Sequence, residues 1–161
     1  MYKKLMDVFV NSTESILKEM ADIDIIKKSA PFTIEEDFNS LGVSSTITFA
    51  GNNSTKGRFI IDISESLALE IVKNILSQNV DNIKERLALS CISEMNNTIA
   101  GDANTHINNN FNLGLRLAPP IVFAGKNIKV ANAKLESVNV VCETSFGNMN
   151  VNIGFTGGEV I

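Results

Sequence analysis

The sequence contains no tryptophan, one tyrosine, one histidine and two cysteines among 161 residues. Aromatic residues make up 6% of the chain, so it offers no platform of aromatic rings on which nucleic-acid bases could stack. The 14 Lys and Arg residues are outnumbered by 18 acidic residues, for a net charge of -4, and form no basic run. Because nucleic acid and anionic membranes are bound by clustered basic side chains, we expect neither as a partner.

The scarcity of histidine and cysteine also excludes most metal sites. His106 is the only histidine, and Cys91 and Cys142 are far apart in the sequence, whereas zinc sites use closely spaced ligands. Both cysteines lie in apolar segments, which indicates buried free thiols in a reducing cytoplasm. We therefore expect no metal and no cofactor held by the chain itself, and a surface or packing role for His106.

The chain also lacks a long hydrophobic run. Its N-terminal apolar residues are interrupted by Asp7, Asn11, Ser12 and Glu14, which is typical of neither a signal peptide nor a membrane span. Apolar residues make up 44% and charged residues 20%, as in ordinary globular proteins. A chain of 161 residues can bury a core without disulfides, so we expect one cytoplasmic domain over residues 1–161.

Hydrophobic periodicity predicts alternating helices and strands. The expected helices cover 3–21, 64–78 with Ser64 as N-cap, and about 82–109, and the expected strands lie within 32–51 and 57–64 around a loop at 51–57. Pro119 and Pro120 end any helix, and strands follow within 127–145 and 148–158, joined by a turn at 145–148.

The order of elements places a helix before a β-hairpin twice. The fold class is therefore α+β, an antiparallel sheet packed with helices and built as a pseudo-two-fold repeat. Met149, Val151, Ile153 and Phe155 alternate with asparagines that we expect to face solvent. This alternation would permit the final strand to pair at a sheet edge.

The long third helix carries an unusual polar stripe. On a helical wheel its core face consists of Ala88, Ile92, Met95, Ile99 and Ala103. The opposite, exposed ridge consists of Ser90, Glu94, Asn97 and Gly101, with the carboxylate and the carboxamide one turn apart. Gly101 costs about 1 kcal/mol relative to alanine in a helix interior, and it would allow another backbone to approach closely.

Spacing alone does not make this ridge a site, because a polar stripe is usually a solvated face. The same Glu-x-x-Asn spacing occurs at Glu36 with Asn39 and at Glu136 with Asn139. Those pairs lie in extended segments, where side chains three residues apart point to opposite faces.

The surrounding residues are more specific. The run SCISEMNNTIAGDANTHI resembles the signature helix of the CheC/CheX family of chemotaxis phosphatases, which act on the phosphorylated response regulator CheY. The family pattern is Asp or Ser, three residues, Glu, two residues, Asn, 22 residues and Pro. Ser90, Glu94, Asn97 and Pro120 match every position.

The resemblance implies a function and roles for these residues. The substrate would be the aspartyl phosphate of a CheY-type response regulator, hydrolysed by a water molecule that Asn97 orients. Glu94 would pair with the lysine of the receiver domain, and Ser90 and Pro120 would have supporting roles. Mg²⁺ would be supplied at the active site of the response regulator.

CheC-like members carry a second such site in the first half of the chain. Here the N-terminal helix offers Glu14 with Leu17 and Glu19 with Asp22, and neither pair fits the pattern. The chain therefore resembles CheX more than CheC, which implies a CheC-like fold and a homodimer. Two alternatives are a non-catalytic CheY-binding adaptor or scaffold on the same fold, and a CheC-like protein with a diverged first site that associates with a receptor deamidase.

Overall fold

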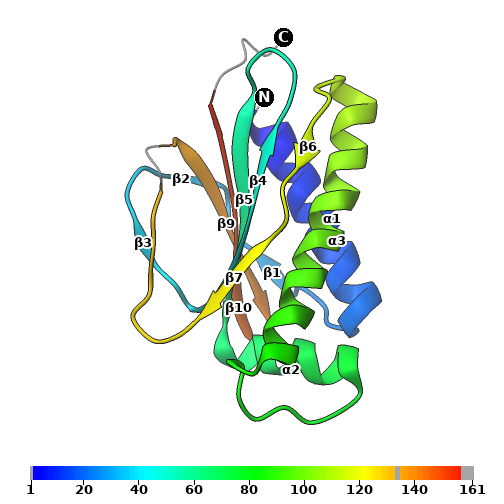
Figure 1. Ribbon diagram of the computed structural model, residues 1–161, viewed down its shortest axis with the longest axis vertical. Coiled ribbons are helices and arrows are strands. Elements are labelled where there is room, and N and C mark those ends of the chain that lie inside the picture. Colours follow the sequence, from blue (N-terminus) through cyan, green and yellow to red (C-terminus); the bar gives the residue numbers. More distant parts are fainter. Residues whose placement is uncertain (1, 133–134, 157–161) are drawn as a thin grey trace.

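Helices and an antiparallel sheet form two layers. The computed structural model describes residues 2–132 and 135–156. Helices α1 (Tyr2–Ala21) and α3 (Arg86–Phe111) lie side by side against the sheet, and the shorter α2 (Glu65–Leu76) lies near one end of it (Figure 1). The predicted α+β class is confirmed. None of the helices in these ranges is long and apolar enough to cross a membrane.

Two long hairpins form the middle of the sheet. The first joins β4 (Gly42–Ala50) to β5 (Lys56–Ser64), and the second joins β9 (Ser137–Thr144) to β10 (Gly147–Thr156). Their second strands pair with each other, from Ile63 opposite Met149 to Lys56 opposite Thr156. The strand order is β1-β9-β10-β5-β4-β6.

The short strands of each half of the chain pair with strands of the other half. They are β1 (Lys27–Lys28), β2 (Phe32–Ile34), β3 (Phe38–Asn39), β6 (Arg116–Leu117), β7 (Ile121–Ala124) and β8 (Lys129–Val130). From the first half, β1 and β2 pair with β9; from the second half, β6 and β7 pair with β4. This reciprocal arrangement confirms the predicted pseudo-two-fold repeat of a helix followed by a hairpin.

The two faces of the sheet differ in chemistry. On the helix side, Val43 and Ile47 of β4 and Met149, Val151 and Ile153 of β10 are fully buried in the hydrophobic core. The opposite face carries Asp62, whose carboxylate accepts hydrogen bonds from Ser40 Oγ (2.6 Å), Ser44 Oγ (2.5 Å) and the Leu41 backbone N–H (3.0 Å).

Several details of the sequence prediction were wrong. The asparagines of β10 were expected to face solvent, but Asn152 is fully buried, because the chain around β2, β3 and β8 folds back over this face. The edge pairing that the alternation of the final strand would permit is not available, because β10 lies between β9 and β5 and both its sides are already paired. Residues 157–158, included in that predicted strand, lie outside the described ranges.

One helix start and one helix cap also differ from expectation. Helix α3 begins at Arg86 rather than near residue 82, because Asn82 forms a turn in which its Oδ1 accepts from the Lys84 N–H (3.0 Å) and its carbonyl from the Glu85 N–H (3.1 Å). Ser64 does occupy the N-cap position of α2, but its side chain makes no capping hydrogen bond.

The cysteines behave as predicted. Cys91 and Cys142 are both free and buried. Burial raises the pKa of the Cys142 thiol to about 11. The charge of Lys28 lowers this pKa and the charge of Glu14 raises it, both by less than burial does. Burial also raises the pKa of Cys91, so neither thiol ionises readily near neutral pH.

Candidate functional site

The apolar face of α3 is buried as the helical wheel predicted. The side chains of Ile92, Met95, Ile99 and Ala103 are fully buried, and Ala88 is 1% exposed. The helix contacts β4, β6 and β7 on the sheet and also packs against α1 and α2. Its rotation is therefore set by a continuous strip of apolar contacts.

The predicted ridge lies on the outer side of the same helix. Ser90, Glu94 and Asn97 are exposed and Gly101 is half-buried. The structure records no hydrogen bond or ion pair from the Glu94 carboxylate or the Asn97 amide to the described residues, so both remain available to a partner. A Cβ added at Gly101 would meet nothing within 4 Å, so packing inside the chain does not require glycine there.

A buried asparagine next to the ridge fixes the helix to the sheet. Asn96 is fully buried, and its Nδ2 donates to the Ser45 carbonyl (3.1 Å) and to Ser45 Oγ (2.9 Å) on β4. Sequence reasoning missed this residue, because an asparagine beside another asparagine resembles a solvated position. These hydrogen bonds fix the helical turn that carries Glu94 and Asn97 at the level of Ser45 on β4.

Pro120, the distant member of the motif, is attached to the same stretch of β4. The Ala118 N–H donates to the Thr48 carbonyl (2.8 Å), and Ile121, directly after Pro120, lies opposite Thr46 where β7 pairs with β4. The middle of α3 and the segment around Pro120 are thus fixed to neighbouring residues of one strand. This geometry explains why a long sequence spacer separates two features that are neighbours on the sheet.

Asp102 and His106, one turn apart on α3, face α1 rather than the ridge. Ser12 Oγ on α1 donates to Asp102 Oδ2 (2.7 Å), and His106 Nε2 lies 3.7 Å from Asp102 Oδ1. Asp102 is thus an acidic neighbour of His106, one turn away on the same side of the helix. The exposed His106 imidazole agrees with the expected surface role.

The first helix carries no equivalent pair, in agreement with the prediction of a single motif. Leu17 is fully buried, so it cannot accompany Glu14 on a surface. Glu14 Oε2 is engaged by Lys28 Nζ at 2.5 Å, and Asp22 Oδ1 by Lys18 Nζ at 2.7 Å.

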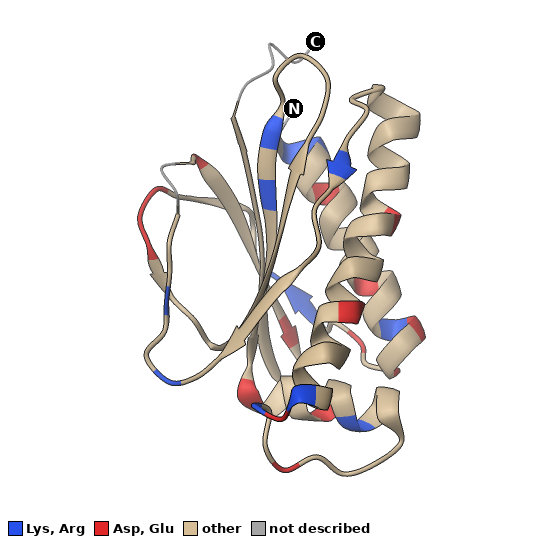
Figure 2. Ribbon diagram, in the orientation of Figure 1, with Lys and Arg blue, Asp and Glu red and all other residues tan. Residues whose placement is uncertain are grey.

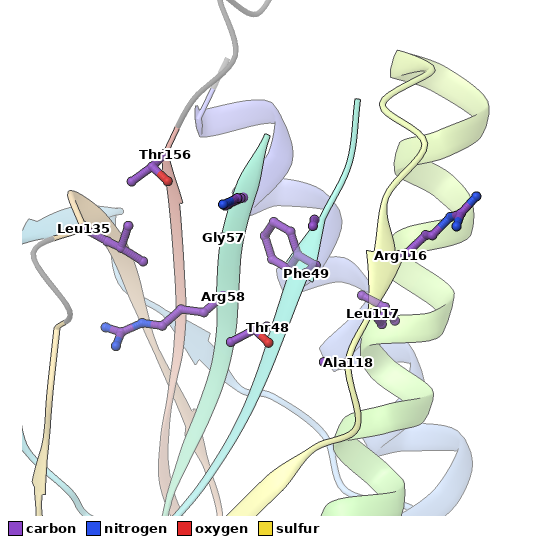
Figure 3. A pocket seen from close by; sticks show the side chains of 11 residues that line it. Thr48, Phe49, Gly57, Arg58, Arg116, Leu117, Ala118, Leu135 and Thr156 are labelled. Atoms are coloured by element: carbon purple, nitrogen blue, oxygen red, sulfur yellow. The ribbon is translucent and has the colours of Figure 1, made fainter. Parts of the chain in front are cut away.

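One pocket in the described part of the chain lies away from the ridge. A pocket of about 550 Å³ is found at the end of the sheet, between Leu117 and Leu135. Figure 3 shows Arg58 extending along the sheet below it and Arg116 pointing away from it. No ridge residue lines this pocket. The ridge is thus an exposed helix surface that lies outside this pocket.

Charge is sparse along the ridge. Most of α3 carries no charged side chain, as the long tan stretches of this helix in Figure 2 show. Within residues 87–101, Glu94 is the only charged residue. Among residues 2–132 and 135–156 no group of three or more His, Cys, Asp or Glu side chains is placed to hold a metal ion.

Comparison with known families agrees with the geometry of this helix. Residues 43–143, which include α3 and Pro120, match the family described as chemotaxis phosphatase CheX. The chain belongs to the CheX family. A search of curated proteins finds no significant match.

Solved structures of CheX and CheC-like proteins share the fold over nearly the whole chain. A CheC-like superfamily protein from Shewanella sp. PV-4 is 26% identical, with a TM-score of 0.87 over 98% of this chain and 100% of that one. CheX from Desulfovibrio desulfuricans is 20% identical, with a TM-score of 0.85 over 95% and 99% of the two chains. CheX from Borrelia burgdorferi, solved with CheY, BeF₃ and Mg²⁺, is 22% identical, with a TM-score of 0.78 over 96% and 97%.

Replacing Asn96 should loosen the helix that carries the ridge. Asn96→Ala removes two buried hydrogen bonds and leaves the Ser45 hydroxyl without this partner, so we expect a loss of about 1–3 kcal/mol in the free energy of unfolding. Urea denaturation measures this loss. Asn109→Ala, at an exposed position of the same helix, is the control and should change stability by less than about 0.5 kcal/mol. Equal stability of the two variants would contradict a clamping role for Asn96.

Proposed function

We propose that this protein accelerates hydrolysis of the aspartyl phosphate of a CheY-type response regulator. The observation that supports this most directly is the pair Glu94 and Asn97, exposed and one turn apart on an otherwise uncharged ridge of a CheX-family helix. The complex of the Borrelia burgdorferi relative with CheY supports the choice of partner. In this proposal Mg²⁺ is held by the receiver domain, and this chain contributes no ligand to it.

Asn97 is proposed to orient the attacking water. A receiver domain already supplies the phosphorylated aspartate, so a partner needs only to position a water molecule in line with the bond that breaks. A carboxamide has both a donor and an acceptor and carries no charge. A carboxylate at this place would instead be repelled by the phosphoryl oxygens.

Glu94 is proposed to fix the register of the complex. Residues three apart on a helix have Cβ atoms about 5–6 Å apart. The Glu94 side chain can therefore hold the lysine of the receiver while the Asn97 side chain reaches the phosphoryl group. Ser90 and Gly101 extend the same ridge, and the open space outside Gly101 leaves room for the backbone of a partner. Pro120 would shape the connection between β6 and β7 beside the helix.

Asn97→Ala should abolish most of the acceleration. Removing a group that acts on the transition state typically lowers the rate by about 10²–10³-fold. The measurement is the decay of a phosphorylated CheY-type receiver with Mg²⁺, alone and with catalytic amounts of wild-type protein, Asn97→Ala or the control Asn109→Ala. Acceleration by wild type and by Asn109→Ala, but not by Asn97→Ala, would support the proposal. If none of the three proteins accelerates decay but a complex still forms, the ridge is a docking surface and the protein is a non-catalytic adaptor.

Glu94→Ala should mainly weaken binding. Loss of an interfacial ion pair is expected to raise KM about tenfold or more, whereas the rate at saturating receiver should fall less than in Asn97→Ala. Glu36→Ala removes an exposed glutamate elsewhere and serves as the control. Unchanged KM in Glu94→Ala would exclude Glu94 as the anchor.

We further propose a homodimer in which β7 supplies the contact. Its sequence, Ile121–Ala124, is entirely apolar, Ile121 is 68% exposed, and among described strands β7 pairs with β4 alone. Unprotected apolar edges favour strand pairing between chains. Light scattering should give about twice the chain mass of 17.5 kDa, and Ile121→Lys should restore the monomer mass. Ile26→Lys, at an exposed isoleucine outside β7, should remain dimeric, and a dimer in Ile121→Lys would exclude this edge.

A further inference from the structure

The N-terminal end of the ridge carries an exposed leucine. Among the large apolar side chains exposed in the described ranges, Leu87 is the only one on a helix, and it is 54% exposed. The others lie on loops, turns or short strands: Ile26, Phe32, Leu41, Ile121 and Phe146. Leu87 does not belong to the hydrophobic core or to the side chains packed against it, so the fold makes little use of this side chain.

Leu87 points in nearly the same direction as Glu94, and it lies about 80° from Asn97 around the axis of α3. It precedes Glu94 by seven residues, so the two side chains differ by only about 20° around the axis of α3 and by about 10 Å along it. Leu87 lies about 15 Å along the axis from Asn97. A standard interface buries about 800 Å² per partner, a patch roughly 30 Å across. A partner centred between Glu94 and Asn97 would therefore reach Leu87 near the rim of its contact area.

The composition of this stretch resembles an interface more than a solvated surface. From Leu87 to Gly101 the chain contains Glu94 and no other charged residue. Cores of protein–protein interfaces are depleted in charge and contain apolar anchors. Because α3 is one uninterrupted helix from Arg86 to Phe111, the spacing between Leu87 and Asn97 is rigid. A partner that contacts both residues therefore meets them at a fixed spacing.

We propose that Leu87 is an apolar anchor that docks this helix onto the receiver domain. The inference rests on the proposed function of Glu94 and Asn97, and it adds a residue that governs affinity and choice of partner. Leu87 is too far from Asn97 to touch the phosphoryl group, so it acts on complex formation and leaves the chemical step unchanged. Its partner would be an apolar patch of the receiver about 15 Å from the phosphorylated aspartate.

The test separates binding from chemistry. Leu87→Ala should raise KM for the phosphorylated receiver, and Kd for the BeF₃-loaded receiver, about tenfold, because the apolar area of the leucine is no longer buried. The turnover rate at saturation and the thermal stability should stay as in wild type, because Leu87 does not pack on the core. Leu41→Ala, a leucine that is 42% exposed on the chain beside Asp62, removes the same atoms elsewhere and should leave both constants unchanged.

The possible outcomes distinguish failure of the Leu87 anchor from failure of the proposed phosphatase function. Unchanged KM and Kd in Leu87→Ala, with an active wild type, overturn the anchor and leave the phosphatase intact. A wild type that binds without accelerating hydrolysis overturns the phosphatase, and the Kd of Leu87→Ala then still decides the anchor. A wild type that neither binds nor accelerates overturns both. A change of molecular mass in Leu87→Ala without a change in Kd would assign the leucine to self-association and overturn the anchor.

Discussion

The rotation of α3 about its own axis is the constraint on which the exposed ridge depends. Ile92, Met95 and Ile99 are fully buried against the sheet and the other helices, and each would lose about 1.5–3 kcal/mol if the helix turned it into water. These contacts resist rotation, and the hydrogen bonds from Asn96 to Ser45 resist sliding along β4. Glu94 and Asn97 are therefore presented by a rigid support, as the proposed positioning of a water molecule would require.

The sheet face opposite the helices buries polar side chains. Buried polar side chains there must find partners, because an unpaired buried polar group is costly. Arg58 donates to the Ala131 carbonyl and to Asn132 Oδ1 (2.7 Å), and burial lowers the pKa of its guanidinium. Asn132 Nδ2 in turn donates to the carbonyls of Ile34 and Leu135. These hydrogen bonds tie the chain around β2 and β8 onto the sheet.

Local patterns in the sequence were enough to identify the hairpins, the helices and the inward and outward faces of α3. Periodicity reports which side of one element is apolar, and Ile92 and Asn97 have opposite exposure for that reason. What covers a face is decided by segments distant in sequence, so the burial of Asn96 and Asn152 and the central place of β10 were not predictable from their own neighbours. The roles proposed for Glu94 and Asn97 came from resemblance to a family, because an exposed Glu-x-x-Asn pair has no specific local signal.

The central place of β10 has a consequence for how the protein is made. The sheet joins β5 to a strand at the far end of the described chain, and such non-local pairing is slow because a long loop must close first. On a ribosome, β5 would be synthesised long before the strand that covers its side. Until then the first half would present an unpaired, strongly apolar strand edge, the kind of surface that aggregates or engages chaperones. Folding of the central sheet must therefore wait until translation has passed Thr156.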